Sequence, residues 1–353
     1  MPQLFDPIVI RDLEIKNRAW VSPMCQYSAT DGLVGEWHHV HLGSFATGGA
    51  GLVMAEATGV TPEGRISLGC PGLYNEAQVA AWAPIVNFAH SMGAKIGIQL
   101  AHAGRKAGTT VPGSAHFMAT PEEGGWQAVA PSAIAFEGYP EPRALTVTEI
   151  HELVKSFGAA AKRAIAAGFD LLEIHAAHGY LLHEFYSPLS NLRSDEYGGD
   201  FEGRTRFLME VVQEIRTSID QSVPLFVRIS ATDWTIGGWS SDDSVRLANE
   251  LLPLGVDLID VSSGGNVYNA NIAVGPGYQV AFSEAIKHGS PIKTSAVGMI
   301  TDPMQADTII ASGQADAVML AREFLRNPRW PLHAAQVLGV DIKWPTQIVR
   351  GKL

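Results

Sequence analysis

The segment GFDLLEIHAAHG, residues 168–179, decides the fold of this chain. It opens with a glycine that can close the helical stretch before it in a left-handed conformation. A nearly continuous apolar strand follows, and it ends in two histidines and a second glycine. Such a run predicts a parallel strand covered on both faces, because polar alternation disappears where neither face meets water.

The same order of helix, glycine, apolar strand and polar turn recurs along the chain. Segments of this kind begin at Gly49, Gly93, Gly168, Gly255 and Gly313. Three more strands are predicted at RAWVSPM from residue 18, LFVRIS from 225 and IKTSAVGMI from 292. Eight strands alternating with helices favour an α/β fold, a (β/α)8 TIM barrel, over a doubly wound sheet. No Gly-x-Gly-x-x-Gly follows the first strand, which counts against a Rossmann half.

Two helices between these strands have good periodicity. The spacing predicts them over 146–167, opened by a capping box of Thr146 and Glu149, and over 202–219.

The chain has 353 residues, a surplus over a barrel of about 250 residues. We expect a single barrel domain over 1–353 with three additions. These are an N-terminal β-hairpin acting as a lid at the barrel bottom over 1–17, a capping loop after the third strand over 104–144, and a C-terminal tail over 340–353. The loop is rich in proline and glycine and too long for a simple connector, so we expect it on the catalytic face.

Composition narrows the class of protein. Hydrophobic residues make up 46% of the chain, which is enough for a large core, and 25 Lys and Arg face 36 Asp and Glu. This acidic balance argues against nucleic-acid and membrane partners, and no apolar run approaches the roughly 20 residues that span a bilayer. The first residues lack the pattern of a signal peptide. Cys25 and Cys70 sit in unlike sequence contexts with no metal or disulfide spacing, so we expect a reducing cytoplasm.

In such a barrel the reactive groups lie at the carboxyl ends of the strands. The residues predicted there are, in strand order, Ser22, Pro23, Met24 and Cys25; Glu56, Ala57 and Thr58; Gln99 and His102; His175, His178 and Tyr180; Arg228; Ser262, Ser263 and Gly264; Gly298; and Ala321 and Arg322. Uncharged donors, imidazoles, a phenol and two guanidinium groups therefore meet in one cup with almost no carboxylate. A glycosidase would need a carboxylate pair there.

His175 and His178 allow several interpretations. They could be ordinary strand-end histidines whose nitrogens bond to the backbone. Together with Glu173 they could form the centre of a metal-dependent hydrolase or aldolase. A third possibility is a flavin-binding protein whose barrel serves as a partner surface.

A bound flavin mononucleotide (FMN) accounts for the same cup. Gly298 and Arg322 follow the seventh and eighth strands, where barrels commonly hold a phosphate group. Gln99 and Arg228 offer donors and acceptors for the pyrimidine edge of the ring. Either arginine could form a surface ion pair instead, but both follow apolar strands, where an uncompensated cation is costly. A ligand is the simpler explanation.

Several motifs together closely resemble the Old Yellow Enzyme family, and more narrowly the bacterial thermophilic-like branch of its FMN-dependent ene-reductases. They are SPMCQYSA from residue 22, QLAHAGRKA from 99, IHAAHGYLLHEFYSPLSNLRSDEYGGDFEGR from 174, LFVRIS from 225, AVGMIT from 296 and LAREFLRNP from 320. The likeness covers essentially the whole chain, and the block from residue 174 is its most specific part.

The resemblance implies the roles of individual residues. His175 and His178 would hold the oxygen of the substrate, Tyr180 would donate a proton, and Tyr27 would lie near the substrate. Non-covalent contacts to FMN are implied for Ser22, Pro23, Met24, Cys25, Ala57, Gln99, Arg228, Ser263, Gly264, Gly298, Ala321 and Arg322.

The resemblance also implies an activity and an assembly. NAD(P)H would reduce the flavin, and the activated C=C bond of an α,β-unsaturated carbonyl or a nitroalkene would then be reduced. Arg350, in the terminal QIVRGKL, stands where the branch places an arginine that reaches the active site of a neighbouring subunit, which implies a homodimer or homotetramer. The sequence departs from the branch at Ile348 and Lys352, which replace aromatic residues, and over 110–126, which is longer than usual.

Overall fold

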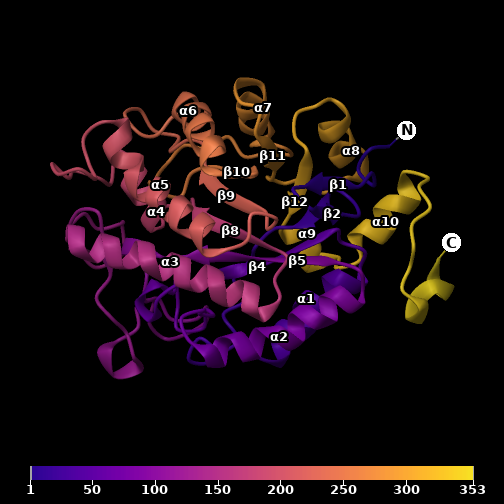
Figure 1. The fold of residues 1–353 in the computed structure, drawn as a ribbon, viewed down its shortest axis with the longest axis horizontal. Coiled ribbons are helices and arrows are strands. Elements are labelled where there is room, and N and C mark those ends of the chain that lie inside the picture. The colour runs from indigo at the N-terminus through magenta and orange to yellow at the C-terminus, as the bar shows by residue number, and fades with distance from the viewer. Residues whose placement is uncertain (1, 353) are drawn as a thin grey trace.

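The computed structural model describes residues 2–352 and shows a closed barrel of eight parallel strands. The strands follow one another around the barrel in chain order, and helices surround them (Figure 1). The barrel strands are β3 (Ala19–Val21), β4 (Leu52–Gly59), β5 (Lys95–Ala101), β8 (Leu171–Ala176), β9 (Leu225–Ser230), β10 (Leu258–Ser262), β11 (Lys293–Ala296) and β12 (Ala317–Leu320). All eight predicted strands are present, so the predicted (β/α)8 fold is confirmed.

The helices of residues 2–352 include the two whose ranges the sequence predicts. The α-helices are α1 (Glu36–Thr47), α2 (Glu76–Ser91), α3 (Val147–Ala167), α4 (Leu181–Tyr186), α5 (Phe201–Ser218), α6 (Ser241–Leu251), α7 (Val280–Gly289), α8 (Pro303–Ala311), α9 (Arg322–Arg326) and α10 (Trp330–Val337). The capping box of Thr146 and Glu149 starts α3 as predicted, and Gly168 ends it with a φ of 97°. Helix α5 begins one residue before the predicted 202, with Asp200 as its N-cap.

The predicted hairpin consists of β1 (Ile8–Ile10) and β2 (Leu13–Ile15), paired antiparallel. Its isoleucines pack in one cluster with Trp20 and Phe226, which lie inside the barrel near the amino ends of β3 and β9. The hairpin therefore closes the end of the barrel opposite the predicted cup.

The long loop after β5 contains two short strands, β6 (Val129–Ala130) and β7 (Arg143–Ala144), which pair in parallel. Its contacts reach the loops that follow β8 and β10. Arg105 Nη2 donates to the side-chain and backbone oxygens of Asn266 at 2.8 and 2.9 Å. The loop is thus fixed at the carboxyl ends of these strands.

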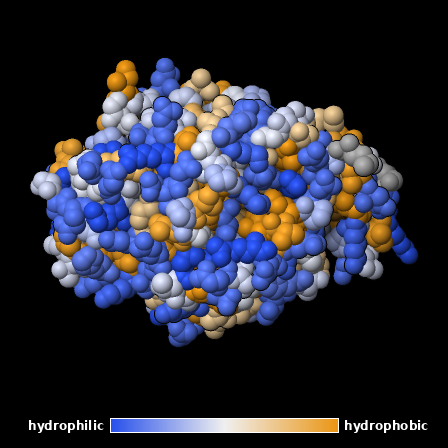
Figure 2. Space-filling view, turned by 45° about the horizontal axis from the view of Figure 1, so that its top comes forward, coloured by the Kyte–Doolittle hydropathy of each residue, from blue (hydrophilic) through white to orange (hydrophobic). Residues whose placement is uncertain are grey.

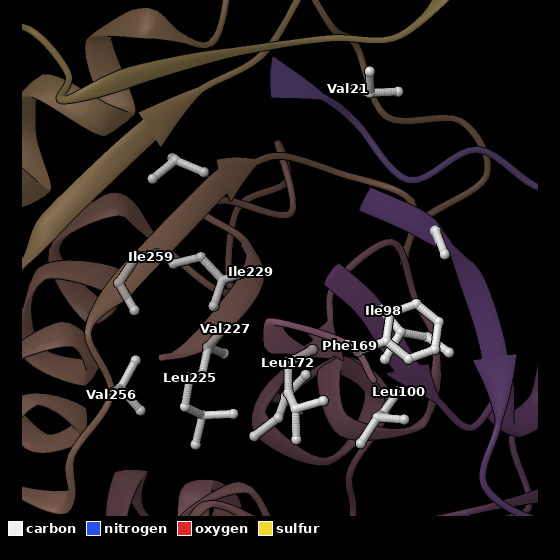
Figure 3. Close-up of a cluster of buried hydrophobic side chains, with 14 of the residues drawn as sticks. Val21, Ile98, Leu100, Phe169, Leu172, Leu225, Val227, Ile229, Val256 and Ile259 are labelled. Carbon is white, nitrogen blue, oxygen red and sulfur yellow. The ribbon is translucent and has the colours of Figure 1, made fainter. Parts of the chain in front are cut away.

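Strand residues alternate between two packed layers. Val227 and Ile229 point away from the barrel axis into the apolar layer that strands and helices share (Figure 3). Phe226 and Arg228 alternate with them and point inward, one above the other. Apart from the first residues of β5 and β11, the barrel strands are buried on both faces, as the continuous apolar runs indicate.

The outer surface is mostly hydrophilic on the face in Figure 2, with apolar patches between the polar regions. Among residues 2–352, none of the helices combines the length and apolar character needed to cross a membrane.

Candidate active site

The inner face of the barrel changes from apolar to polar toward the carboxyl ends of the strands. On β8, Leu171 is followed inward by Glu173 and then His175. On β9, Arg228 follows Phe226. All five side chains are buried. This alternation lines the floor of the cup with hydrogen-bonding groups.

Arg228 has a charge partner that the sequence interpretation did not provide for. It lies beside Asp260 in the register of β9 and β10, and its Nε lies 3.0 Å from Asp260 Oδ2. The premise of an uncompensated cation is therefore wrong for Arg228, and it is wrong for Arg322 because that side chain is exposed to water. A ligand at these two arginines is therefore supported by their position at the strand ends, and not by the lack of a charge partner.

Glu173 faces the interior and holds Gln99 in one orientation. Gln99 Nε2 donates to Glu173 Oε1 at 2.8 Å, which directs the amide oxygen of Gln99 away from that contact. Burial and the neighbouring Asp260 together raise the pKa of Glu173 to about 8, so the carboxyl is largely protonated at pH 7. The structure thus adds Glu173 and Asp260 to a cup for which almost no carboxylate was expected.

His175, His178 and Tyr180 meet above this floor. The ring of His175 lies 5.0 Å from the ring of Tyr180 and 5.2 Å from that of His178, measured between centroids. Burial, together with the charge of Arg228, keeps the pKa of both imidazoles well below the usual range. Burial raises the pKa of Tyr180 well above its usual value. At pH 7 the site therefore holds two neutral imidazoles and a protonated phenol.

Two serines position His178. Its backbone N–H donates to Ser230 Oγ at 2.8 Å, and its ring Nε2 lies 2.7 Å from Ser262 Oγ. Ser262 is much farther, 3.4 Å, from its other acceptor, Gln279 Oε1, which already accepts from Ser263 at 2.6 Å. The short contact favours a hydroxyl of Ser262 that donates to His178 Nε2, which would leave the ring proton on Nδ1.

Lys106 and His183 also hold the loop after β8 that contains His178, and neither had a predicted role. Lys106 Nζ donates to the carbonyl oxygens of His178 and Gly265 at 2.6 and 2.9 Å and lies 4.9 Å from the centroid of the Tyr180 ring. His183 Nδ1 accepts from Gly179 N–H at 2.9 Å, and its Nε2 lies 2.9 Å from the buried Asp233. Lys106 and His183 both lie within the sequence motifs quoted above, and no other feature of the sequence marked them as part of the site.

The loop after β8 also touches the loop after β10 without side chains between them. Gly179 has a φ of 71°, and a Cβ built there would lie 2.2 Å from the carbonyl oxygen of Gly265. Only glycine permits this approach.

A cavity of about 210 Å³ lies at the ends of β11 and β12. Gly298, Ala321 and Arg322 line it, as the predicted phosphate site requires. Gly298 has a φ of 130°, and a Cβ there would approach Gln279 Nε2 to 3.0 Å. The glycine thus keeps the wall of the cavity open.

Several buried polar atoms of the cup, His102 Nε2 and Glu173 Oε2 among them, make no hydrogen bond within residues 2–352. Ser22 Oγ and His175 Nδ1 are buried and likewise lack a partner within these residues. Buried polar groups normally have hydrogen-bond partners, so these atoms point to a ligand.

The register of β4 places another predicted contact, Ala57, beside Gln99. It does so because the pairing of β4 with β5 is irregular between Ala55 and Ala57.

Cys25 and Cys70 are neighbours in space, although their spacing in the sequence matched no metal or disulfide pattern. Their sulfur atoms and a carboxylate oxygen of Glu56 all lie within 4.8 Å of one another. Tyr27, two residues after Cys25, has an exposed ring and a φ of 55°.

Arg350 is the one predicted site residue that the structure does not bring to the cup. It is exposed in a 3₁₀ helix, Thr346–Gly351, and lines a surface pocket with Arg329 and Trp344.

Comparison with known proteins decides the family. The family model described as NADH:flavin oxidoreductase / NADH oxidase matches residues 3–340. The chain belongs to this family. It is 48% identical over 351 residues to an NADPH dehydrogenase of Geobacillus thermodenitrificans, covering 99% of this chain and 98% of that protein. An NADPH dehydrogenase of Bacillus subtilis is 45% identical over 352 residues, or 99% of each protein.

Solved structures agree with this assignment. Morphinone reductase superposes with a TM-score of 0.81 at 29% identity, covering 98% of this chain and 91% of that one. The old yellow enzyme homologue from Zymomonas mobilis gives 0.79 at 30% identity, covering 99% and 98%. The resemblance to the Old Yellow Enzyme family is confirmed. The protein is an oxidoreductase that uses FMN and a nicotinamide reductant, and the metal-dependent hydrolase or aldolase is not supported.

The cup fits FMN. The glycine-walled cavity with Arg322 suits a phosphate, Gln99 and Arg228 suit the polar edge of the ring, and Ser22 Oγ is a buried group in need of a partner. The predicted contacts to FMN all lie at strand ends or in the loops that follow them, and their assignment as contacts stays a prediction.

Proposed function

We propose that this protein is an NAD(P)H-dependent ene-reductase that reduces the activated C=C bond of α,β-unsaturated carbonyls and nitroalkenes. The observation that carries this proposal is the convergence of two neutral imidazoles and a protonated phenol over a cup that fits FMN. When bound, FMN supplies a hydride that it has received from NAD(P)H.

His175 and His178 bind the oxygen of the substrate. A neutral imidazole carries one N–H, so each ring donates one hydrogen bond, and this polarises the alkene toward hydride acceptance at its β-carbon. The unpartnered His175 Nδ1 and the Nδ1 proton that Ser262 assigns to His178 supply these donors. Arg228 places a fixed positive charge below them.

Tyr180 donates a proton to the α-carbon. Its phenol is protonated at pH 7, and Lys106 over the ring stabilises the negative charge that remains after the proton has left. Tyr27, from the loop that follows β3, borders the substrate.

The remaining parts of the site complete the proposal. Residues 1–353 form one FMN-binding domain in which the segment 104–144 caps the cup and the hairpin over 1–17 closes the barrel bottom. The exposed Arg350 reaches the active site of a neighbouring copy in a homodimer or homotetramer, which suits its distance from the cup of its own chain. We place the protein in the cytoplasm, where its nicotinamide reductant is available.

Anaerobic stopped-flow spectroscopy tests the roles of the three residues, because the flavin loses colour with NAD(P)H and regains it with 2-cyclohexenone. Removing one oxyanion donor costs about 2.7–4 kcal/mol, so His178→Ala should bind the enone weakly and reoxidise slowly. Tyr180→Phe should bind it nearly normally and reoxidise slowly. Both variants should be reduced by NAD(P)H at the wild-type rate. Wild-type binding and reoxidation in both variants would show that these residues are structural.

A further inference from the structure

Cys25 and Cys70 are the two cysteines of the chain, and packing brings them together. They lie on segments that run against each other: Ala29 N–H donates to the carbonyl oxygen of Gly69 at 2.9 Å, and a Cβ at Gly69 would lie 2.6 Å from the carbonyl oxygen of Tyr27. With these backbones held, the two sulfur atoms stay within 4.8 Å of each other.

The surroundings of this pair suit thiol chemistry. The hydrogen bond between the two thiols lowers the pKa of Cys70, which favours Cys70 as the attacking thiolate, and Ser67 Oγ lies 3.3 Å from Cys70 Sγ. The same hydrogen bond raises the pKa of Cys25, so Cys25 reacts with an oxidant only after it has passed its proton to a nearby base. A carboxylate oxygen of Glu56 is within 4.8 Å of both sulfurs. Cys70 is fully buried, whereas Cys25 is partly exposed. A small oxidant therefore meets Cys25 first.

We propose that Cys25 and Cys70 are a reversible oxidation site that closes to an intramolecular disulfide in the presence of a hydroperoxide. Glu56 takes the proton of Cys25, the thiolate attacks one oxygen of the peroxide, and the O–O bond breaks. This gives a sulfenic acid and a hydroxide, which takes the proton back from Glu56 as water. Glu56 takes the proton of Cys70, the Cys70 thiolate attacks the sulfenic sulfur, and the S–O bond breaks. The released hydroxide takes the proton back as water. Two thiols lose two electrons in total, and one H₂O₂ becomes two waters.

The disulfide would remove the Cys25 thiol from the cup, and only this consequence rests on the proposed function. Reversible cytosolic disulfides are usually redox sensors, so the expected cytoplasmic location suits such a pair.

Thiol counting on the intact flavin-loaded protein tests the proposal independently of activity. The protein is treated with H₂O₂, the excess is removed with catalase, and free thiols are counted after denaturation. We expect both thiols to disappear, the intact mass to fall by two hydrogen atoms, a Cys25–Cys70 peptide to appear in a non-reducing digest, and dithiothreitol to restore both thiols. Persistence of both thiols, or a disulfide between two chains, would overturn the proposal.

Matched variants assign the order of events. In Cys70→Ser the sulfenic acid cannot be resolved, so Cys25 should gain oxygen atoms and reach a state that dithiothreitol does not reverse. In Cys25→Ala the buried Cys70 should resist the same treatment. If Cys70→Ser yields a reducible product like that of the wild type, Cys70 is not the resolving thiol. The wild-type digest needs no variant, so the proposal stays testable if either variant fails to fold.

Discussion

The two ends of the barrel interior are filled by different kinds of side chain. Near the amino ends of the strands the inward residues are large and apolar, among them Trp20, Leu52, Leu171, Phe226 and Met319, and the hairpin covers them. Near the carboxyl ends the inward residues are polar or charged, among them Gln99, Glu173, Arg228 and Asp260. The same strands carry both sets, often two residues apart.

This difference separates stability from function along each strand. Burying apolar side chains stabilises the fold, whereas burying Glu173, Arg228 and Asp260 costs free energy that their mutual contacts only partly offset. A protein keeps such groups where they serve a ligand. Substitutions at the amino end should therefore change unfolding, and substitutions at the carboxyl end should change binding and chemistry.

The largest expected effect is on stability, from Phe226→Ala. Phe226 is buried and stacks on Trp20 with ring centroids 5.9 Å apart. The cavity left by a truncated aromatic residue costs about 3–5 kcal/mol, so thermal unfolding should occur at a much lower temperature. FMN affinity measured well below that temperature should change little. Phe226→Leu serves as the milder control. An unchanged melting temperature would show that the amino end does not stabilise the barrel.

Arg322→Ala should weaken FMN binding. A hydrogen bond to a charged group is worth about 1.5–3 kcal/mol, which corresponds to a roughly 10- to 100-fold weaker affinity. Fluorescence titration of the flavin-free protein with FMN measures this. Arg163→Ala is the control, because Arg163 already pairs with Glu76 at 3.0 Å and does not line this cavity. Equal affinity of Arg322→Ala and wild type would remove the phosphate assignment.

Ser262→Ala should slow one half of the reaction. Without the hydroxyl the tautomer of His178 is no longer fixed, and losing one hydrogen bond costs about 0.5–1.5 kcal/mol. We expect slower reoxidation by the enone and normal reduction by NAD(P)H in stopped flow. Ser262→Thr keeps the hydroxyl and should restore the rate. A uniform loss in both half-reactions would indicate general damage to the cup.

Cys25→Ala should have the smallest effect on turnover. We expect the Cys25 sulfur to contact the flavin and not to act as a catalytic nucleophile, so activity should persist while the flavin reduction potential moves. Spectroelectrochemical titration with a reference dye measures the potential. An unaltered potential combined with lost activity would instead point to covalent catalysis.

Local signals made the barrel and the capping of α3 predictable. Gly49, Gly93, Gly168, Gly255 and Gly313 all have positive φ between 71° and 97°, as expected where a glycine precedes a buried strand. Thr146 and Glu149 cap α3 because both partners lie within one turn.

The contacts that sequence reasoning missed depend on register and loop packing. Asp260 lies beside Arg228 only because β9 and β10 pair in one register, and Cys25 meets Cys70 only because the loops after β3 and β4 pack together. Neither relation is encoded in a local pattern. Inward-facing carboxyls at Glu173 and Asp260 could have been anticipated from strand alternation, since each lies two residues after an inward leucine.

The contact of Gly179 with Gly265 limits how this enzyme can be evolved in the laboratory. Any side chain at Gly179 meets the carbonyl of Gly265, and any at Gly265 meets the backbone of His178 at 2.6 Å. Random mutagenesis of these two loops should therefore yield mostly inactive clones. Libraries that seek new substrates should place their diversity around His116 and Phe117, which are exposed in the 104–144 segment and lie apart in sequence from Lys106, the residue of that segment that holds His178.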